Sequence, residues 1–407
     1  MLMTVNGRQV VYNGGPFQSY WWADEHEPVH PAVSAVLSDM VDTKALELAW
    51  DAVKKVYPVT DLVPDDYDEE ILFFSGEEAS VPVNSREHPI PVGKAASGRG
   101  FVLSWYDRTI TLGAYHSLAD EIGLMRIFTV LMKCYAAFQK DKTGSSAEVP
   151  ETIKEEECFV QSTMLVPTEY EPQKIALYPD IRDLFTDPEA VNDEAQITTA
   201  RLVFSAADFE DLCKTNDASS EELLACLIAK AIYALYPDEK KQLCFGMMTD
   251  FRDAFGVERT IAPCSKRMPL ILSREEVVDR SAEETLRKIA DIRRHQKEDA
   301  YIKSHLAMEN TYAVLNLRNV CTCINFAGTF ETGKQSVDIT DITMTDYSSN
   351  SVFLLRAGER AHLSLQYGKA TGKYLRAVAG VLETMGIRVL RTTEPYTLRA
   401  ETSTPVL

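Results

Sequence analysis

Long apolar runs are missing from this 407-residue chain, and so is any excess of positive charge. No apolar stretch approaches the ~20 residues that a membrane-spanning helix needs, and the N-terminus lacks the basic region and apolar core of a signal peptide. Lysine and arginine number 42 against 61 aspartates and glutamates, which gives a net charge of -19. This balance argues against nucleic acid or an anionic membrane surface as a partner. We therefore predict no membrane span, no nucleic-acid partner and a cytoplasmic location.

Cysteine pairs with metal-binding spacing are also absent. The chain has eight cysteines, and none of them stands in a Cys-x-x-Cys arrangement. No cluster of cysteine and histidine completes a zinc site. We expect the cysteines to be reduced and mostly structural, and we predict no metal site.

The remaining composition is that of an ordinary globular protein, with 45% hydrophobic and 25% charged residues. A chain of 407 residues is too long for one ordinary core and predicts two subdomains. Hydrophobic periodicity weakens between about 139 and 195, and residues 141–150 have loop composition. We therefore expect an N-terminal subdomain at 1–150, a link at 151–196 and a C-terminal subdomain at 197–407.

Helix and strand signals are clear in the second part of the chain. A helix is predicted over 219–235, with Ser219 or Ser220 as its N-cap, and another over about 281–300, where Ser281 and Glu284 have the spacing of a capping box. Strands are expected at 200–205, 352–356 and 361–367, before a last helix at about 374–385. His362 lies within the third of these strands, and we interpret it as a buried histidine with a polar partner.

The most informative segment is Ile110–Gly123, in which His116 and Asp120 stand four residues apart. A neutral imidazole, with an unperturbed pKa near ~6.5, suits general-base chemistry at cellular pH. The same spacing recurs at His295 and Asp299, inside a charged run on the polar side of a predicted amphipathic helix. We interpret the second pair as a solvated surface, and the first as a general base with its orienting carboxylate.

The flanks of the first pair support this interpretation. Residues 101–115 have the β-branched and aromatic content of two strands joined by a turn at 107–108. Residues 122–138 repeat apolar side chains at the spacing of a helix packed on a sheet. His116 is thus predicted at a strand-to-helix junction, where ligand sites tend to form in such proteins.

In this setting the chain resembles the CoA-dependent acyltransferase superfamily, which includes chloramphenicol acetyltransferase, alcohol acetyltransferases, polyketide-associated acyltransferases and the condensation domains of nonribosomal peptide synthetases. The shared motif of that superfamily is His-His-x-x-x-Asp-Gly. His116 matches its second, catalytic histidine and Asp120 matches its aspartate, whereas Tyr115 stands for the first histidine and Glu121 for the glycine.

The resemblance extends over most of the chain, because other segments follow in the family's order. They are a helix ending in proline at 45–58, a helix at 219–235, a strand end carrying an arginine at 246–252, a strand end at 325–328 and a late strand at 363–368. The resemblance implies an α/β fold (an α+β sandwich) of two chloramphenicol-acetyltransferase-like subdomains, which form a pseudodimer with a channel between them.

The resemblance also implies an activity and its residues. We expect acyl transfer from a thioester, either acyl-CoA or an acyl-phosphopantetheine carrier, to the hydroxyl or amine of a small-molecule acceptor, with His116 as general base and no tightly bound cofactor. Asp120 is expected to point away from the substrate and to pair with Arg252. The candidate oxyanion or substrate contacts are Ser265, Asn325, Tyr115 and Glu121.

Two other functions stay open at this point. One is a free-standing condensation-type enzyme that uses carrier-bound substrates, with the carrier protein supplied in trans. The other is a degenerate, non-catalytic protein that binds a thioester or a partner, which the departures at Tyr115 and Glu121 allow. An anionic ligand such as CoA needs only a local group of cations, and the candidates are Lys266 with Arg267 or Lys369 with Lys373, although surface solubility is the favoured interpretation of each pair.

Overall fold

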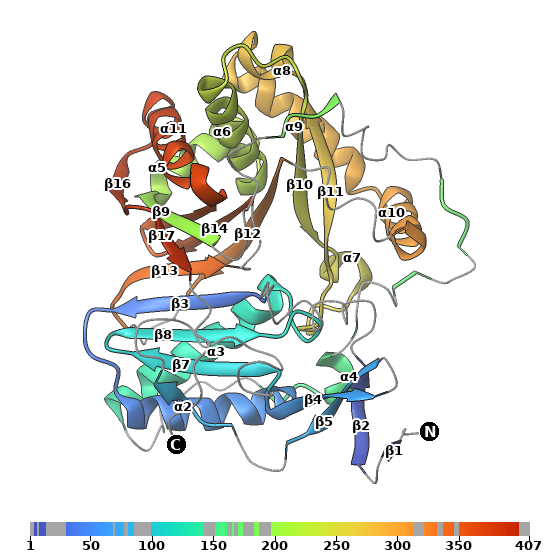
Figure 1. Cartoon of the computed structure of the whole chain (residues 1–407), viewed down its shortest axis with the longest axis vertical. Helices are drawn as coiled ribbons and strands as arrows, with labels where there is room; N and C mark the ends of the chain where they lie inside the picture. The colour runs from blue at the N-terminus through green and yellow to red at the C-terminus, as the bar shows by residue number, and fades with distance from the viewer. Residues whose placement is uncertain are drawn as a thin grey trace.

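The computed structural model describes residues 4–5, 8–13, 30–67, 70–76, 80–84, 99–141, 151–158, 160, 165–166, 170–173, 183–186, 197–312, 321–331, 337–345 and 350–398. The chain folds into two halves, each built on β-sheet and helices and each with its own hydrophobic core. Figure 1 shows the second half above the first, with β3 and β13 at the boundary. This confirms the predicted α/β fold of two subdomains.

The first half contains a five-stranded sheet in the order β13-β3-β8-β7-β6, in which only β6 and β7 run parallel. α3 (Glu121–Lys140) packs on β3 and β8, and α2 (Thr43–Val56) packs along α3. The strands are β3 (Ala32–Leu37), β6 (Val83–Asn84), β7 (Phe101–Tyr106), β8 (Thr109–Ala114) and β13 (Ile339–Thr345).

A second, smaller sheet of the first half has the order β1-β2-β5-β4. Its strands are β1 (Thr4–Val5), β2 (Arg8–Asn13), β4 (Leu62–Tyr67) and β5 (Glu70–Ser75), and the short helices nearby are η3 (Pro58–Asp61) and α4 (Glu155–Cys158).

Local sequence explains the elements that carry the motif. The predicted turn between β7 and β8 is confirmed, and Asp107 adopts a left-handed backbone there with φ of 51°, which aspartate tolerates better than most residues. α2 begins after Asp42, whose carboxylate accepts a hydrogen bond from the amide of Ala45 over 3.0 Å, and it ends before Pro58, as expected.

The second half is built on one large sheet with the order β11-β10-β12-β14-β15-β9-β16, and β17 also pairs with β9. β10, β12 and β14 run parallel to one another. The strands are β9 (Ile197–Ser205), β10 (Leu243–Asp250), β11 (Ser265–Leu272), β12 (Thr322–Phe330), β14 (Ser351–Ala357), β15 (Arg360–Gln366), β16 (Val389–Thr392) and β17 (Tyr396–Leu398).

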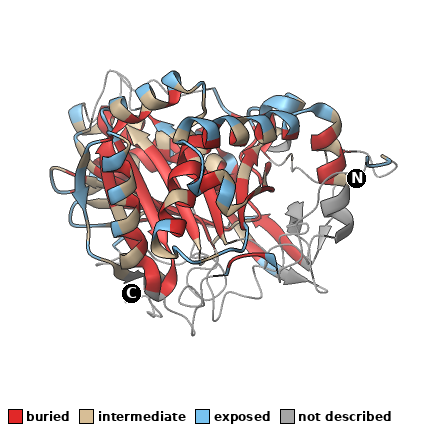
Figure 2. Cartoon of the chain, turned by 90° about the horizontal axis from the view of Figure 1, so that it is seen from above, coloured by how far each residue is buried: buried red, intermediate tan, exposed pale blue. Residues whose placement is uncertain are grey.

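The two faces of this sheet differ in chemistry. Alternate apolar residues, such as Leu202 and Leu363, pack under helices and form the core of the second half. We call this the outer face, and Figure 2 shows its helices with buried sides on the strands and exposed sides outward. On the opposite face Phe353 and Leu355 join the core of the first half, so we call that the inner face.

The helices of the second half confirm the predicted capping signals. Ser219 and Glu222 form a capping box at the start of α6, and Ser281 and Glu284 form another at α9. The helix expected over 281–300 is two helices, because α9 ends at Gln296 and α10 begins at Asp299. The helices are α5 (Ala206–Thr215), α6 (Ser220–Leu235), α7 (Arg252–Phe255), α8 (Arg274–Val278), α9 (Ala282–Gln296), α10 (Asp299–Tyr312), η7 (Gly368–Ala370) and α11 (Thr371–Thr384).

One segment of the second half lies in the sheet of the first. β13 pairs with β3 from Ile339 to Thr345 and extends the five-stranded sheet, although these residues fall within the stretch expected to form the C-terminal subdomain. A pairing between strands about 300 residues apart leaves no local sequence signal. Most of the expected link at 151–196 lies outside the described residues; within it, the amide of Ile153 donates to the carbonyl of Val56 over 2.9 Å.

The prediction that a strand ends at 325–328 is wrong. β12 continues to Phe330 through an irregularity between Phe326 and Gly328, where the glycine has φ of +98°. Among the described residues, no helix has both the length and the apolar character needed to cross a bilayer.

Candidate active site

His116 lies in the loop that joins β8 to α3. The loop is anchored as soon as it leaves the sheet, because the amide of Tyr115 donates to the carbonyl of Gly100 over 2.7 Å. Within residues 115–120, every residue except His116 is buried, whereas His116 is half-buried. His116 is therefore the residue of the segment 115–120 that retains partial solvent exposure.

Tyr115 points into the core of the first half. Its ring is fully buried and lies 5.1 Å from the ring of His30 and 5.8 Å from that of Phe73. This position makes Tyr115 a packing residue that holds the start of the loop, in contrast to the substrate contact considered from the motif.

Asp120 caps α3 and is 1% exposed. Its Oδ1 accepts hydrogen bonds from the amide of Gly123 over 2.8 Å and from Nη2 of Arg252 over 2.7 Å. Its Oδ2 accepts from the amides of Cys264 and Ser265 over 3.0 and 3.1 Å. Since four donors converge on this carboxylate, it serves to fix the loop, and the backbone amide of Ser265 is already engaged.

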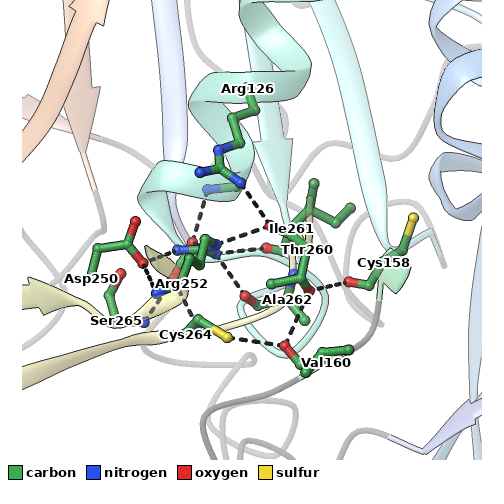
Figure 3. A network of polar contacts seen from close by, with 12 residues as sticks. Arg126, Cys158, Val160, Asp250, Arg252, Thr260, Ile261, Ala262, Cys264 and Ser265 are labelled. Carbon is green, nitrogen blue, oxygen red and sulfur yellow. Dashed lines mark hydrogen bonds and ion pairs between the residues drawn. The ribbon is translucent and has the colours of Figure 1, made fainter. Parts of the chain in front are cut away.

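Arg252, at the start of α7, is fully buried. It lies at the centre of the polar network in Figure 3. Its Nη1 donates to Oδ1 of Asp250 over 2.9 Å, and its Nη2 forms the ion pair with Asp120. The remaining donors reach the carbonyls of Thr260 and Ala262 over 2.9 and 2.7 Å. The predicted pairing of Asp120 with Arg252 is thus present, and each nitrogen of the planar guanidinium has at least one acceptor.

The charges of this cluster are mutually dependent. Burial alone would raise the pKa of Asp120, but the charge of Arg252 and the hydrogen bonds to Arg252, Gly123 and Cys264 outweigh it and hold that pKa below its ordinary value. Burial opposes the charge of Arg252 as well, and the two carboxylates beside it keep the pKa of Arg252 above its usual range. For Asp250, burial and the nearby charge of Asp120 win, so its pKa is raised despite Arg252.

The same region joins the two halves of the molecule. A Cβ atom on Gly123 would lie 2.0 Å from the carbonyl oxygen of Ile261, so only glycine allows α3 to approach this loop. Arg126 of α3 donates to the carbonyls of Glu258 and Thr260. We use the name Arg252 clasp for Asp120, Gly123, Arg126, Arg252 and the loop 258–265.

The clasp also holds part of the link between the halves. The hydroxyl of Thr260 donates to the carbonyls of Cys158 and Val160 over 2.8 and 3.1 Å, and Sγ of Cys264 reaches the carbonyl of Val160 over 3.0 Å (Figure 3). Link, first half and second half therefore meet at the loop that orients His116.

Ser265, the last residue of the clasp loop, and Asn325 both lie on the inner face. Ser265 pairs with Asp250 at the start of β11, and Asn325 lies on β12, on the other side of β10. Both residues are more than nine-tenths buried, and neither Oγ of Ser265 nor Oδ1 of Asn325 has a hydrogen-bond partner in the part of the chain that the structure describes. The structure thus places both predicted residues on one face of the sheet, inside the protein.

Glu121 is the first residue of α3 and is 6% exposed. A carboxylate in the first turn of a helix is favoured by the helix dipole, typically by about 0.3 to 1 kcal/mol. The acidic residue at the position of the motif glycine is therefore compatible with this helix start.

Comparison with known proteins rests on the fold. A scan against protein-family models gives no match, and neither does a search of curated proteins. Among solved structures, polyketide synthase associated protein 5 from Mycobacterium tuberculosis matches with a TM-score of 0.65 and 14% identity, covering 92% of this chain and 97% of that one. TRI3 trichothecene 15-O-acetyltransferase from Fusarium sporotrichioides matches with a TM-score of 0.62 and 11% identity over 95% and 97%. TRI101 of F. sporotrichioides, complexed with coenzyme A and T-2, gives 0.61 and 12% over 90% and 97%.

The chain has the fold of these proteins. The match runs over nearly the whole length of both chains in each pair, so it is a match of the whole fold and not of one half. At this level the resemblance drawn from the motif and from the order of segments is confirmed.

Several parts of the site were not predicted. The amides of Cys264 and Ser265 that hold Asp120, and the contribution of Arg126, depend on a loop about 140 residues away from the motif. Gly123 did leave a signal, because a glycine in the first turn of a helix costs about 1 kcal/mol relative to alanine and calls for a packing reason.

We next consider groups that could bind a metal ion or an anionic ligand. The described residues contain no group of three or more His, Cys, Asp or Glu side chains that could hold a metal ion. All eight cysteines are free, and seven are buried. Of the cations considered for an anionic ligand, Lys373 donates to the hydroxyl of Tyr236 over 2.6 Å, Arg267 lies on the inner face in register with Met248, and the side chain of Lys369 lies outside the described residues.

Proposed function

We propose that the protein transfers an acyl group from a thioester to a hydroxyl or amine, with His116 as the general base. The observation that carries this proposal is the different environment of two residues in one loop. Asp120 is buried and engaged by four donors, whereas His116, four residues earlier, keeps access to solvent at the strand-to-helix junction. In this arrangement the carboxylate positions the loop, and the imidazole is the group that contacts the substrate.

The chemistry follows from these positions. The neutral imidazole of His116 accepts the proton of the acceptor's O–H or N–H as the oxygen or nitrogen forms a bond to the thioester carbonyl carbon. The carbonyl oxygen becomes an oxyanion, and the C–S bond then breaks as the oxyanion collapses. The imidazolium returns its proton to the departing thiolate, so the base is regenerated.

An oxyanion in such a step needs a hydrogen-bond donor. Among the four predicted candidates, Ser265 suits this role best. Its hydroxyl is buried with no hydrogen-bond partner among the described residues, and Ser265 begins the strand that abuts the Asp120 loop. The Oδ1 atom of Asn325 is an acceptor and suits a different part of the substrate.

The donor is proposed to be acyl-CoA or an acyl-phosphopantetheine. Two findings support a thioester: TRI101 shares the fold and is complexed with coenzyme A, and TRI3 shares the fold and is a 15-O-acetyltransferase. A net charge of -19 disfavours docking of acidic carrier proteins, so free acyl-CoA is the donor to try first.

Product detection by mass spectrometry tests this function. Wild type, His116→Ala and His295→Ala are incubated with a panel of acyl-CoAs and a mixture of alcohols and amines. We expect acylated product or slow thioester hydrolysis with wild type and His295→Ala, and a loss of about 10² to 10⁴-fold with His116→Ala, the usual contribution of general-base help. His295 is the matched control because its side chain is 65% exposed and lies in the other His-x-x-x-Asp pair.

Two results would contradict the proposal. Undiminished turnover in His116→Ala would remove His116 as the base. Thioester binding without product from any CoA or carrier-bound donor would favour the non-catalytic alternative, while product only from a donor loaded on a carrier protein would favour the condensation-type enzyme.

A further inference from the structure

A row of polar side chains crosses the inner face of the large sheet at one level. The strand registers pair Thr199 of β9 with Gln366 of β15, Gln366 with Ser351 of β14, and Ser351 with Cys323 of β12. Paired residues in a sheet present their side chains to the same face. These four residues, which we call the inner row, therefore form one stripe although they come from four separate strands.

Two members of the inner row are buried without hydrogen-bond partners. Thr199 is 1% exposed and Gln366 is 0% exposed. Oγ1 of Thr199 and both Oε1 and Nε2 of Gln366 lack a partner in the described part of the chain. Asn325, one strand position further along β12 on the same face of the sheet, adds an unpartnered Oδ1.

Nearby polar groups on the same face are satisfied, which makes this contrast informative. His362 of β15 contacts Oδ1 of Asp341 through Nδ1 at 3.0 Å, and Arg201 of β9 donates to Oδ2 of Asp341 over 2.9 Å. Asp341 belongs to β13, so the strand contributed to the first half covers this end of β9 and β15. Thr199 and Gln366 pair at the last position of this register, one same-face position beyond Arg201, and Oγ1 of Thr199 and the carboxamide of Gln366 have no hydrogen-bond partner among the described residues.

Leaving a buried donor or acceptor unmatched costs about 1 to 3 kcal/mol per group, and the great majority of buried polar groups in proteins are matched. A hydrocarbon placed against the inner row would leave all of these atoms unmatched. A group that both donates and accepts would satisfy a carboxamide such as that of Gln366 on both of its ends. The chemistry of the row therefore selects an amide over an alkyl chain.

We propose that the inner row binds an amide group of a substrate, with Gln366 accepting its N–H and donating to its C=O, and Thr199 adding a hydroxyl. This inference deepens the proposed acyl transfer and rests on it for the identity of the substrates. The amide has two sources: the pantetheine arm of the thioester, which contains two amides, or an amide-bearing acceptor. Neighbouring strands are about 4.8 Å apart and alternate residues about 7 Å, so Gln366 lies roughly 12 Å from Asn325, the member of the predicted site nearest to it in the sheet.

The experiment uses two apolar replacements and one matched control. Thr199→Val and Gln366→Leu remove the unpartnered atoms, while Thr198→Val makes the same change on the neighbouring residue of β9, whose side chain lies on the outer face. Affinities for pantetheine and for N-acetylethanolamine are measured by titration calorimetry, and thermal unfolding of each ligand-free protein is followed in parallel. Michaelis constants for acetyl-pantetheine and for N-acetylethanolamine are then compared in every variant that turns over.

We expect Thr199→Val and Gln366→Leu to unfold at the same temperature as wild type or higher, since apolar groups replace unmatched polar ones. We expect the affinity for the amide probe to fall about tenfold or more, with Thr198→Val close to wild type. Weaker pantetheine binding with unchanged N-acetylethanolamine binding assigns the amide to the thioester arm, and the reverse assigns it to the acceptor.

The inference and the proposed function fail in different ways. If wild type binds pantetheine but turns nothing over, and Gln366→Leu loses that binding, the amide site stands and the proposed acyl transfer fails. Turnover in wild type with no change of affinity or Michaelis constant in either variant would overturn the row. The amide site would also be overturned if wild type bound neither probe. Marked thermal destabilisation of both variants would overturn it as well, because it would show that the replaced polar atoms have partners within the protein.

Discussion

The Arg252 clasp and the inner row both bury polar groups, and they do so in opposite ways. In the clasp, the guanidinium of Arg252 and the carboxylate of Asp120 are engaged by each other, by Asp250 and by backbone groups. In the inner row, Gln366 and Thr199 are just as deeply buried but have no partner among the described residues. The first pattern is that of a structural joint, and the second is the one on which the proposed amide site rests.

The clasp also holds the loop of the proposed base. The clasp fixes the loop that carries His116 by binding Asp120 from the second half, so the geometry of the imidazole depends on the contact between halves. A buried, satisfied ion pair contributes little net stability but is costly to break on one side. The clasp should therefore respond to mutation mainly through stability, and the inner row mainly through binding.

The largest expected effect comes from breaking the clasp at its centre. Arg252→Met leaves the carboxylate of Asp120 buried without its counter-charge, and we expect it to lower the free energy of unfolding by about 3 to 5 kcal/mol. Urea denaturation measures the change. Arg259→Met is the matched control, because Arg259 forms an exposed pair with Glu157 at 3.4 Å and should cost no more than about 1 kcal/mol.

A double variant sharpens this prediction. Asp120→Asn in the Arg252→Met background removes the stranded charge, so the pair should be less destabilised than the sum of the two single changes. Strict additivity would argue that Asp120 and Arg252 do not depend on each other and would contradict the clasp.

A smaller effect is expected where α3 approaches the clasp. Gly123→Ala forces a Cβ against the carbonyl oxygen of Ile261, which is part of the backbone and cannot rotate away, so we expect a loss of about 1 to 3 kcal/mol. Gly380→Ala, in α11, is the control, since no atom lies within 4 Å of its added Cβ and alanine is favoured in helices by about 1 kcal/mol. Thermal unfolding should therefore shift in opposite directions for the two variants.

The loss of folding stability at low pH tests the charge state of Asp120 in the clasp. Because the pKa of Asp120 is lowered by folding, despite the burial that acts to raise it, this carboxylate stabilises the folded protein at pH values above its unfolded pKa of about 3.9. That contribution is lost as the pH falls through the lower folded pKa. We expect Asp120→Asn to be less stable than wild type at neutral pH and to lose less further stability on acidification, as followed by urea titrations at several pH values. Parallel pH profiles for the two proteins would contradict this assignment.

Local signals explain which parts of the molecule could be predicted. The turn at Asp107, the capping boxes at Ser219 and Ser281 and the end of α2 before Pro58 are set by residues within a few positions of one another. The pairing of Asp120 with Arg252 came from the resemblance of the motif and of the segment 246–252 to a known family, and the ion pair has the expected partners.

The remainder depends on contacts distant in sequence. The exchange of β13 pairs residues near 340 with residues near 35, and the inner row appears only once the registers of four strands are known. From the sequence alone, Gln366 is a polar residue at the end of a predicted strand. Its significance lies in the absence of a partner among the described residues, a property that no sequence window contains.

The smallest expected effect belongs to the second His-x-x-x-Asp pair, which serves as the internal reference for the first. His295 is 65% exposed and contacts Glu298 at 3.1 Å, while Asp299 pairs with Lys303 at 2.9 Å along the next helix. An exposed pair of this kind contributes little, so His295→Ala should change the free energy of unfolding by no more than about 0.5 kcal/mol and leave turnover unaltered. Two histidines with identical spacing would then differ by orders of magnitude in function. The difference would follow from what holds each aspartate: four buried donors for Asp120, and one half-buried lysine for the exposed Asp299. A loss of activity in His295→Ala comparable to that in His116→Ala would break this contrast and move the candidate base away from the clasp.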